Sequence, residues 1–142
     1  MNIWRSNFSI EDLNQFSKNT MLKHLDISIT EIGDNFIKGR MPVDHRTKQP
    51  AGILHGGASV ALAESLGSTA AFMTVDPARK NVVGVEINAN HIRSVSDGFV
   101  EGIARPVHIG RRTQVWEIKI YNPAGKIVCV SRITMAVIEK QP

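Results

Sequence analysis

The chain has 142 residues, of which 42% are hydrophobic and 21% are charged. This balance excludes the disordered and fibrous classes and predicts one globular domain over residues 1–142. The net charge of +4 indicates an anionic partner, but aromatic residues make up only 6% and there is no lysine-rich run. These features argue against nucleic acid, and a phosphorylated small molecule would explain the positive charge as well.

Membrane segments and disulfides are not expected. No apolar run is long enough to span a bilayer, and residues 1–10 lack the apolar core of a signal peptide, so we expect a cytoplasmic protein without membrane contact. Cys129 is the only cysteine, which excludes a disulfide within the chain.

The N-terminal third predicts a short helix and two strands. Ser9 and Asp12 have the spacing of a helix cap, which predicts a helix just after Ser9. Residues 26–32, DISITEI, alternate as a strand does. Turn residues follow at 33–35, and residues 36–43 can return as a second strand.

The rest of the chain predicts a long helix and four more strands. Residues 44–54 are a polar loop, and residues 56–74 are apolar or small all round, as in a mostly buried helix. Short turns then separate alternating runs, which is typical of an antiparallel meander. The four expected strands cover residues 82–92, 99–109, 111–121 and 127–138. The fold class is therefore α+β, with one long helix and five or six antiparallel strands.

Alternation also predicts which side chains share a face. Along residues 82–92, one face is expected to carry Val83, Val85, Ile87 and Ala89. Along residues 111–121, one face is expected to carry Gln114, Trp116, Ile118 and Ile120. Pro106 predicts a bend or an edge position in the strand that contains it.

Glu64 is the only charged residue in the predicted helix. Its neighbours one turn away include Val60, Ala61 and Ser68, whereas a solvated face would carry further charges there. A buried carboxylate without partners is costly, so we expect Glu64 to have a function. Ser68 could donate to this carboxylate or position a water; alone, it could equally be a small packing residue.

The predicted helix begins at His55-Gly56-Gly57. Free N–H groups at a helix N-terminus suit a developing oxyanion, and glycine leaves room for a substrate carbonyl, although ordinary glycine-rich junctions look the same. His55 and Glu64 are nine residues apart, so in one helix they lie on opposite sides and about 13 Å apart along the axis. If they cooperate, Glu64 must meet the helix start of a second copy, which predicts a homodimer with two shared sites.

The segments QPAGILHGGASVALAESLGS and VVGVEINANHIRS resemble bacterial hotdog-fold acyl-CoA thioesterases, in the branch that uses a Glu on the central helix. That branch includes the Arthrobacter-type 4-hydroxybenzoyl-CoA and phenylacetate-pathway enzymes. Within it, the similarity is greatest to the menaquinone-pathway 1,4-dihydroxy-2-naphthoyl-CoA and enterobactin proofreading groups. The resemblance covers nearly the whole chain. It implies an antiparallel sheet wrapped around one helix, a homodimer often assembled as a dimer of dimers, and hydrolysis of acyl-CoA or aroyl-CoA without a cofactor.

The resemblance also implies roles for single residues. Glu64 matches the catalytic carboxylate, and Gly56 matches the residue whose backbone N–H polarises the thioester carbonyl. Gln49 and His55 match polar residues around that carbonyl and the leaving sulfur, and Ser68 matches a helper of the carboxylate or of a water. Without the resemblance, Gln49 would be an ordinary loop residue and His55 a capping or solvent-facing one.

Basic strand ends are candidate contacts for the CoA phosphates, because arginine binds phosphate through paired N–H donors. Such ends can gather at one rim of a sheet, although a scattered basic surface would carry the same charges. The resemblance favours contact with the nucleotide end of CoA. The candidate substrate-binding residues are Val83, His91, Ile92, Arg93, Ser94, His108, Ile109, Gly110, Arg111 and Arg112.

Other chemistries have less support. The chain has no GxSxG motif of serine hydrolases, and its histidines lack the spacing of metal ligands, so no metal is expected. The five histidines are His24, His45, His55, His91 and His108. Two alternatives to hydrolysis stay open: a hotdog dehydratase acting on 3-hydroxyacyl thioesters, and a regulator that binds acyl-CoA without catalysis.

Overall fold

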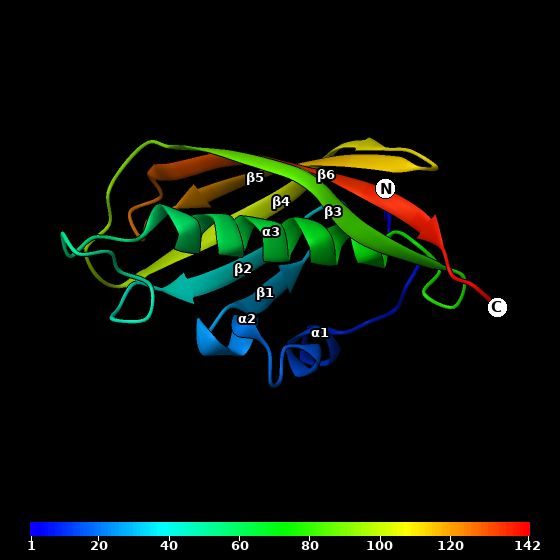
Figure 1. Ribbon diagram of the computed structural model, residues 1–142, viewed down its shortest axis with the longest axis horizontal. Coiled ribbons are helices and arrows are strands. Elements are labelled where there is room, and N and C mark those ends of the chain that lie inside the picture. Colours follow the sequence, from blue (N-terminus) through cyan, green and yellow to red (C-terminus); the bar gives the residue numbers. More distant parts are fainter.

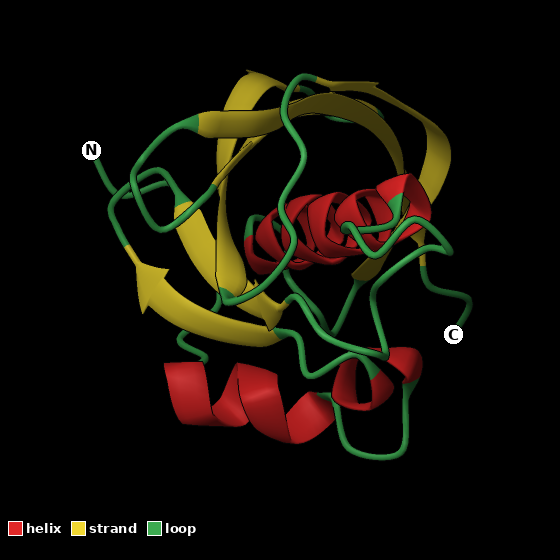
Figure 2. Ribbon diagram, turned by 90° about the vertical axis from the view of Figure 1, so that its left-hand side faces the viewer, coloured by secondary structure: helices red, strands yellow, loops and turns green.

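The computed structural model describes all 142 residues, which form three helices and six strands. They are α1 (Ile10–Phe16), α2 (Met21–His24), β1 (Ser28–Ile32), β2 (Ile37–Pro42), α3 (Gly56–Met73), β3 (Lys80–His91), β4 (Phe99–Ile109), β5 (Thr113–Tyr121) and β6 (Ile127–Glu139). The strands form one antiparallel sheet in the order β1-β2-β4-β5-β6-β3, which curves around α3 (Figures 1 and 2). The expected α+β architecture is confirmed.

The N-terminal helices lie beside β1 (Figure 1). Ser9 Oγ accepts from the Asp12 N–H and the Asp12 carboxylate accepts from the Ser9 N–H, so the predicted cap is present. The side-chain amide of Asn14 bonds both backbone groups of Ile29, at 2.7 and 2.9 Å, and fastens α1 to β1. The sequence did not predict α2, because four residues are too few to show a helical period.

The strand order corrects one expectation. β4, β5 and β6 follow one another as a meander, but β3 does not continue it: β2 pairs directly with β4, and β3 pairs only with β6 at the edge of the sheet. Alternation in a sequence identifies a strand but not its partners. As a consequence, one hydrogen-bonding edge of β3 is free.

The faces of β3 also differ from the expectation. A β-bulge directly after Gly84 makes Val85 an extra residue, and one extra residue exchanges the two faces of a strand. Val82 is therefore buried before the bulge and Ile87 is half-buried after it. The predicted inward residues Val83 and Val85 are instead 43% and 63% exposed.

The predicted face of β5 is confirmed. Trp116, Ile118 and Ile120 are fully buried, and Gln114 is 1% exposed. The Gln114 amide donates to Thr74 Oγ1 at 2.8 Å and accepts from Trp116 Nε1 at 2.9 Å. These partners limit the free-energy cost of burying the amide.

Two glycines let α3 pack closely on the sheet. Gly39 of β2 and Gly102 of β4 are direct cross-strand partners, and the fully buried Leu66 fills the space above them. A Cβ atom would lie 2.5 Å from Leu66 Cδ2 at Gly39 and 2.6 Å from Leu66 Cδ1 at Gly102. The buried residues of α3 are Ala58, Ser59, Leu62, Ala63, Leu66, Gly67, Ala70, Ala71 and Met73.

Replacing one of these glycines tests the packing. Gly102→Ala is expected to lower the free energy of unfolding by about 1–3 kcal/mol, because the added methyl group overlaps Leu66 in a filled core. Urea unfolding followed by circular dichroism measures the change. In a Leu66→Ala background the same substitution should cost much less, and equal costs in both backgrounds would contradict a close contact at this point.

Candidate active site

The loop before α3 is held in shape by its own hydrogen bonds. The Arg46 guanidinium donates to the Asp44 carboxylate, and this bond lowers the pKa of Asp44 to about 2. Thr47 is buried, and its carbonyl accepts from the His55 N–H at 2.8 Å. The loop therefore presents the residue before the helix in a fixed position.

Gln49 begins a tight turn in this loop. The Gly52 N–H donates to the Gln49 carbonyl at 2.9 Å, and Gly52 has a φ of +83°, which favours glycine. The side-chain oxygen of Gln49 accepts from the Ala51 N–H. The side-chain nitrogen has no partner in the chain, so it is the atom of Gln49 that is free to bind a ligand.

The start of α3 leaves one backbone donor free. His55 caps the helix by accepting from the Gly57 N–H through Nδ1, at 2.7 Å. The Gly56 N–H bonds no other group of the chain. The imidazole of His91 lies directly over Gly56, where a Cβ atom would be 2.7 Å from Nε2. Glycine at this position thus lets the His91 imidazole lie against the helix start, while the Gly56 N–H stays without a partner at the positive end of the helix.

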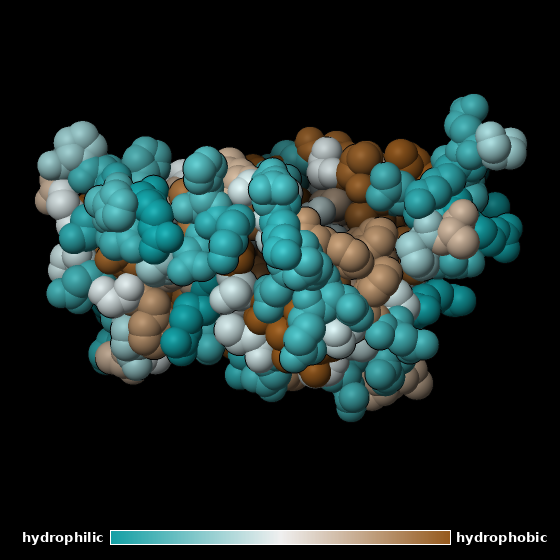
Figure 3. All heavy atoms as spheres, turned by 90° about the horizontal axis from the view of Figure 1, so that it is seen from below, coloured by the Kyte–Doolittle hydropathy of each residue, from teal (hydrophilic) through white to brown (hydrophobic).

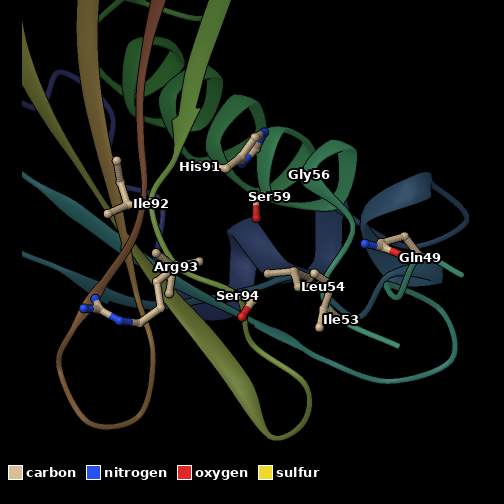
Figure 4. Close-up of a pocket in the computed structure, with 10 residues that line it drawn as sticks. Gln49, Ile53, Leu54, Gly56, Ser59, His91, Ile92, Arg93 and Ser94 are labelled. Atoms are coloured by element: carbon tan, nitrogen blue, oxygen red, sulfur yellow. The ribbon is translucent and has the colours of Figure 1, made fainter. Parts of the chain in front are cut away.

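A cavity of about 300 Å³ opens beside this helix start (Figure 4). Its lining comes from the loop, from α3, from the end of β3 with the residues after it, and from β6. The lining residues are Gln49, Ile53, Leu54, Gly56, Ser59, His91, Ile92, Arg93, Ser94 and Val128. Six of the predicted site residues therefore share one cavity: Gln49, Gly56, His91, Ile92, Arg93 and Ser94.

The position of Glu64 corrects the expectation of a buried carboxylate. Glu64 is exposed in the single chain, because Ala63 and Leu66 take the side of α3 that faces the sheet. No ion pair or hydrogen bond joins its carboxylate to another residue. Ser68, one turn further on and half-buried, does not bond it either.

The Glu64 carboxylate instead lies over the backbone of β3. A Cβ atom at Gly84 would be 2.8 Å from Glu64 Oε2, so only glycine leaves the carboxylate in this place. The β-bulge begins at the same residue. The carboxylate therefore lies against the edge strand of the sheet.

Ser68 lines a second, more apolar hollow of about 280 Å³ between α3, the N-terminal helices and the start of β3. The apolar residues of its lining are Leu13, Phe16, Leu22, Phe72 and Val82. Figure 3 shows the side of the molecule that carries α1 and α2, where apolar atoms reach the surface between hydrophilic side chains. An apolar space is thus present one turn of helix from Glu64.

Known proteins resemble the chain in sequence. The family model of the thioesterase superfamily matches residues 51–129, more than half of the chain. The chain belongs to the thioesterase superfamily. It is 48% identical to the 1,4-dihydroxy-2-naphthoyl-CoA hydrolase of Escherichia coli, over 96% of this chain and 99% of that protein. It is also 48% identical to the proofreading thioesterase EntH of Cronobacter sakazakii, over 96% and 98%.

Solved thioesterase structures share the fold. A thioesterase from Haemophilus influenzae matches with a TM-score of 0.94 and 48% identity, over 96% of this chain and 95% of that one. A mutant thioesterase from Pseudomonas aeruginosa matches with a TM-score of 0.96 and 45% identity, over 98% and 100%. The hotdog fold and an enzymatic, thioester-hydrolysing activity are thereby confirmed.

The two basic segments of this thioesterase lie far apart in the single chain, so one chain alone does not gather them at one rim. His91 is level with Cys129 of β6, whereas Thr113, next to residues 108–112, is level with Ala136. Seven residues of β6 separate the two levels, which corresponds to roughly 23 Å along the strand. Antiparallel β3 and β4 end at opposite ends of the sheet, and this sets the two segments apart.

Two residues of the thioesterase site were missed in the sequence. Ser59 lies three residues after Gly56, a spacing that puts both on one face of the helix, but a serine in an apolar run gave no stronger signal. Gly84 is a glycine within a run of β-branched residues, and such a glycine often marks a bulge or a close approach. The sequence therefore shows the spacing of Ser59 and the position of Gly84, but not which groups lie next to them in the fold.

The thioesterase shows neither a cluster of metal-ligating side chains nor a membrane-spanning helix. No three side chains of His, Cys, Asp or Glu are grouped as a metal ion would need. None of its helices has the length and apolar character to cross a membrane.

Proposed function

We propose that the protein hydrolyses acyl-CoA or aroyl-CoA thioesters to the free acid and CoA, with Glu64 as nucleophile or general base. One observation carries the proposal: the chain holds a free backbone donor at Gly56 and a free carboxylate at Glu64, and neither has a partner of its own. A donor for an oxyanion and a carboxylate near the carbonyl carbon are what acyl transfer needs.

The two groups support a site shared between two chains. Gly56 and Glu64 are eight residues apart on α3, or about 12 Å along the helix axis, and one carbonyl group cannot contact both. In a homodimer, Gly56 of one chain can meet Glu64 of its partner. The exposure of Glu64 in the single chain agrees with such an arrangement.

The free edge of β3 is the surface that such a dimer would use. Val83 and Val85 are exposed on this strand and Ile92 is exposed just after it, and a long unpaired strand edge invites pairing with another strand. A twofold axis would pair β3 antiparallel with its copy, so Lys80 of one chain would approach His91 of its partner. Two such dimers would form the expected dimer of dimers.

This pairing also gives the basic segments a common role. It carries residues 108–112 of one chain toward residues 91–94 of its partner, although they lie apart in the single chain. Arg93, Arg111 and Arg112 then surround one ligand with arginine, which suits the phosphates of CoA.

In the proposed reaction, the thioester carbonyl binds at the free Gly56 N–H, where the helix dipole stabilises the oxyanion. Glu64 of the partner either attacks the carbonyl carbon or takes a proton from a water that attacks it. Direct attack expels the CoA thiolate and leaves a mixed anhydride, which water opens to the acid and the regenerated carboxylate. Water attack gives the same products in one acyl transfer.

The apolar hollow beside Ser68 supports an apolar or aromatic acyl group, because it is apolar and lies one turn from Glu64. The relative from Escherichia coli is named for an aromatic substrate, 1,4-dihydroxy-2-naphthoyl-CoA. We therefore propose this ester, and with it a place in menaquinone biosynthesis, as the first candidate in a panel of acyl-CoA and aroyl-CoA esters.

Glu64→Gln tests the catalytic carboxylate. The variant is expected to release CoA thiol at least about a hundredfold more slowly, because an amide neither attacks nor accepts a proton. A thiol reagent measures release across the ester panel. Glu31→Gln, which removes an exposed carboxylate paired with Lys38, is the control and should behave as the native chain does. Native rates in Glu64→Gln would refute the assignment.

A mixed dimer tests whether the site is shared. Gly56→Ala is expected to be inactive, because its methyl group meets His91 and closes the donor site. In a dimer of one Gly56→Ala chain and one Glu64→Gln chain, one site carries both defects and the other carries none, so about half of the native activity should return. Two affinity tags isolate this dimer. If each site lies within one chain, the mixed dimer stays inactive.

Gly84→Ala tests the place of the carboxylate on β3. The added methyl group is expected to displace Glu64 and lower kcat about tenfold or more, since misplaced catalytic groups lose rate steeply. Glu64→Asp withdraws the carboxylate from Gly84, so adding Gly84→Ala to that variant should cost little more. If the two losses multiply instead, Gly84 acts through the strand or the dimer and not through Glu64.

A further inference from the structure

Ser59 holds a hydroxyl group that the fold itself does not use. The residue is 2% exposed, and its oxygen points from α3 into the cavity, toward the side of Leu54 and Ser94 (Figure 4). No residue of the chain bonds this oxygen. Every side-chain N or O atom that is fully closed off from solvent has a hydrogen-bond partner. The Ser59 hydroxyl has none, so it is not fully closed off and opens onto the cavity.

The free state of this hydroxyl is unusual for a helix. A helical serine commonly donates to the carbonyl four residues earlier, as Ser65 does to Ala61 at 2.7 Å. Ser59 makes no such bond, and its hydroxyl opens onto the cavity, whose lining includes the apolar residues Ile53, Leu54 and Val128. Its position is explained if a ligand supplies the missing partner.

The surroundings of Ser59 select a neutral partner. The arginine of this cavity, Arg93, is exposed and donates to the Ile127 carbonyl at 2.9 Å, and the other basic residue of the lining is His91. A charged group would therefore bind at Arg93 and not at Ser59. A neutral group that both donates and accepts, such as a secondary amide, fits a hydroxyl.

The spacing along α3 indicates which amide this is. Ser59 follows Gly56 by one turn, which separates the two positions by roughly 5–6 Å. In a CoA thioester the first amide nitrogen is two carbons from the sulfur, a comparable distance from the carbonyl. We propose that Ser59 binds this amide of the thiol arm and so holds the thioester at Gly56. The inference rests on the proposed function and assigns a further binding residue to that site.

Ser59→Ala, assayed on three thioesters of one acyl group, tests the inference. The esters are those of CoA, of N-acetylcysteamine, which keeps the amide without phosphates, and of propanethiol, which has no amide. The variant is expected to lose about three- to tenfold in kcat/KM on the first two, mainly through KM, and nothing on the third, because one neutral hydrogen bond is lost. Its Tm should not fall, since the hydroxyl bonds nothing in the fold.

Ser65→Ala is the matched control. This variant removes a hydroxyl group of the same helix, one that donates to the Ala61 carbonyl. It should hydrolyse all three esters at the native rates. Equal losses of Ser59→Ala on all three esters, or no loss on any, would overturn the role of Ser59 while leaving the thioesterase intact. A native chain that releases thiol from none of the three would overturn both this inference and the proposed function.

Discussion

The close approach of α3 to the sheet is the constraint on which the rest of the structure depends. Leu66 sits in the space that Gly39 and Gly102 leave between paired strands, and this contact fixes which side of the helix faces inward. The 18-residue helix α3 then cannot rotate about its own axis, because protein cores are closely packed and any shift would displace neighbouring side chains. As a direct result, Glu64 points outward over the edge strand β3, and Ser59 faces the cavity.

Glycine residues make room for two kinds of neighbouring group in this fold. At Gly39 and Gly102 the missing side chain makes room for a core leucine, whereas at Gly56 and Gly84 it makes room for polar groups. His91 occupies the space over Gly56, and the Glu64 carboxylate occupies the space over Gly84. The same physical device, backbone without a Cβ atom, therefore serves packing on one side of α3 and the candidate active site on the other.

The sequence was sufficient to predict local structure and the main chemical groups. The α3 boundaries, the capping box at Ser9 and the buried side of β5 follow from short-range periodicity and capping, and the structure confirms them. The isolated carboxylate of Glu64 was recognisable because no charged neighbour shares its helix. Local patterns of this kind depend on residues a few positions apart, which a single sequence displays directly.

Long-range features could not be predicted in the same way. The pairing of β2 with β4 depends on contacts across sixty residues, and the bulge after Gly84 reverses a face that alternation alone assigns wrongly. The exposure of Glu64 was missed for a related reason: the composition of a helix indicates that its sides are apolar, but not whether its own chain or another covers each of them.

The free edge of β3 and the exposed carboxylate of Glu64 belong to one surface of the single chain. Within one chain, the bulge leaves Val85 outside the ladder to β6, and Gly84 leaves the carboxylate lying at that same edge. This long edge strand carries the exposed valines Val83 and Val85 beside the exposed polar residues Glu86 and Asn88, and its outer hydrogen-bonding groups are unpaired. The proposed dimer covers the valines and brings each carboxylate to the partner's helix start in a single step. A substitution that leaves β3 pairing intact but moves the carboxylate would therefore abolish catalysis without dissociating the proposed dimer. In a monomeric active site, catalysis and assembly would not be linked in this way.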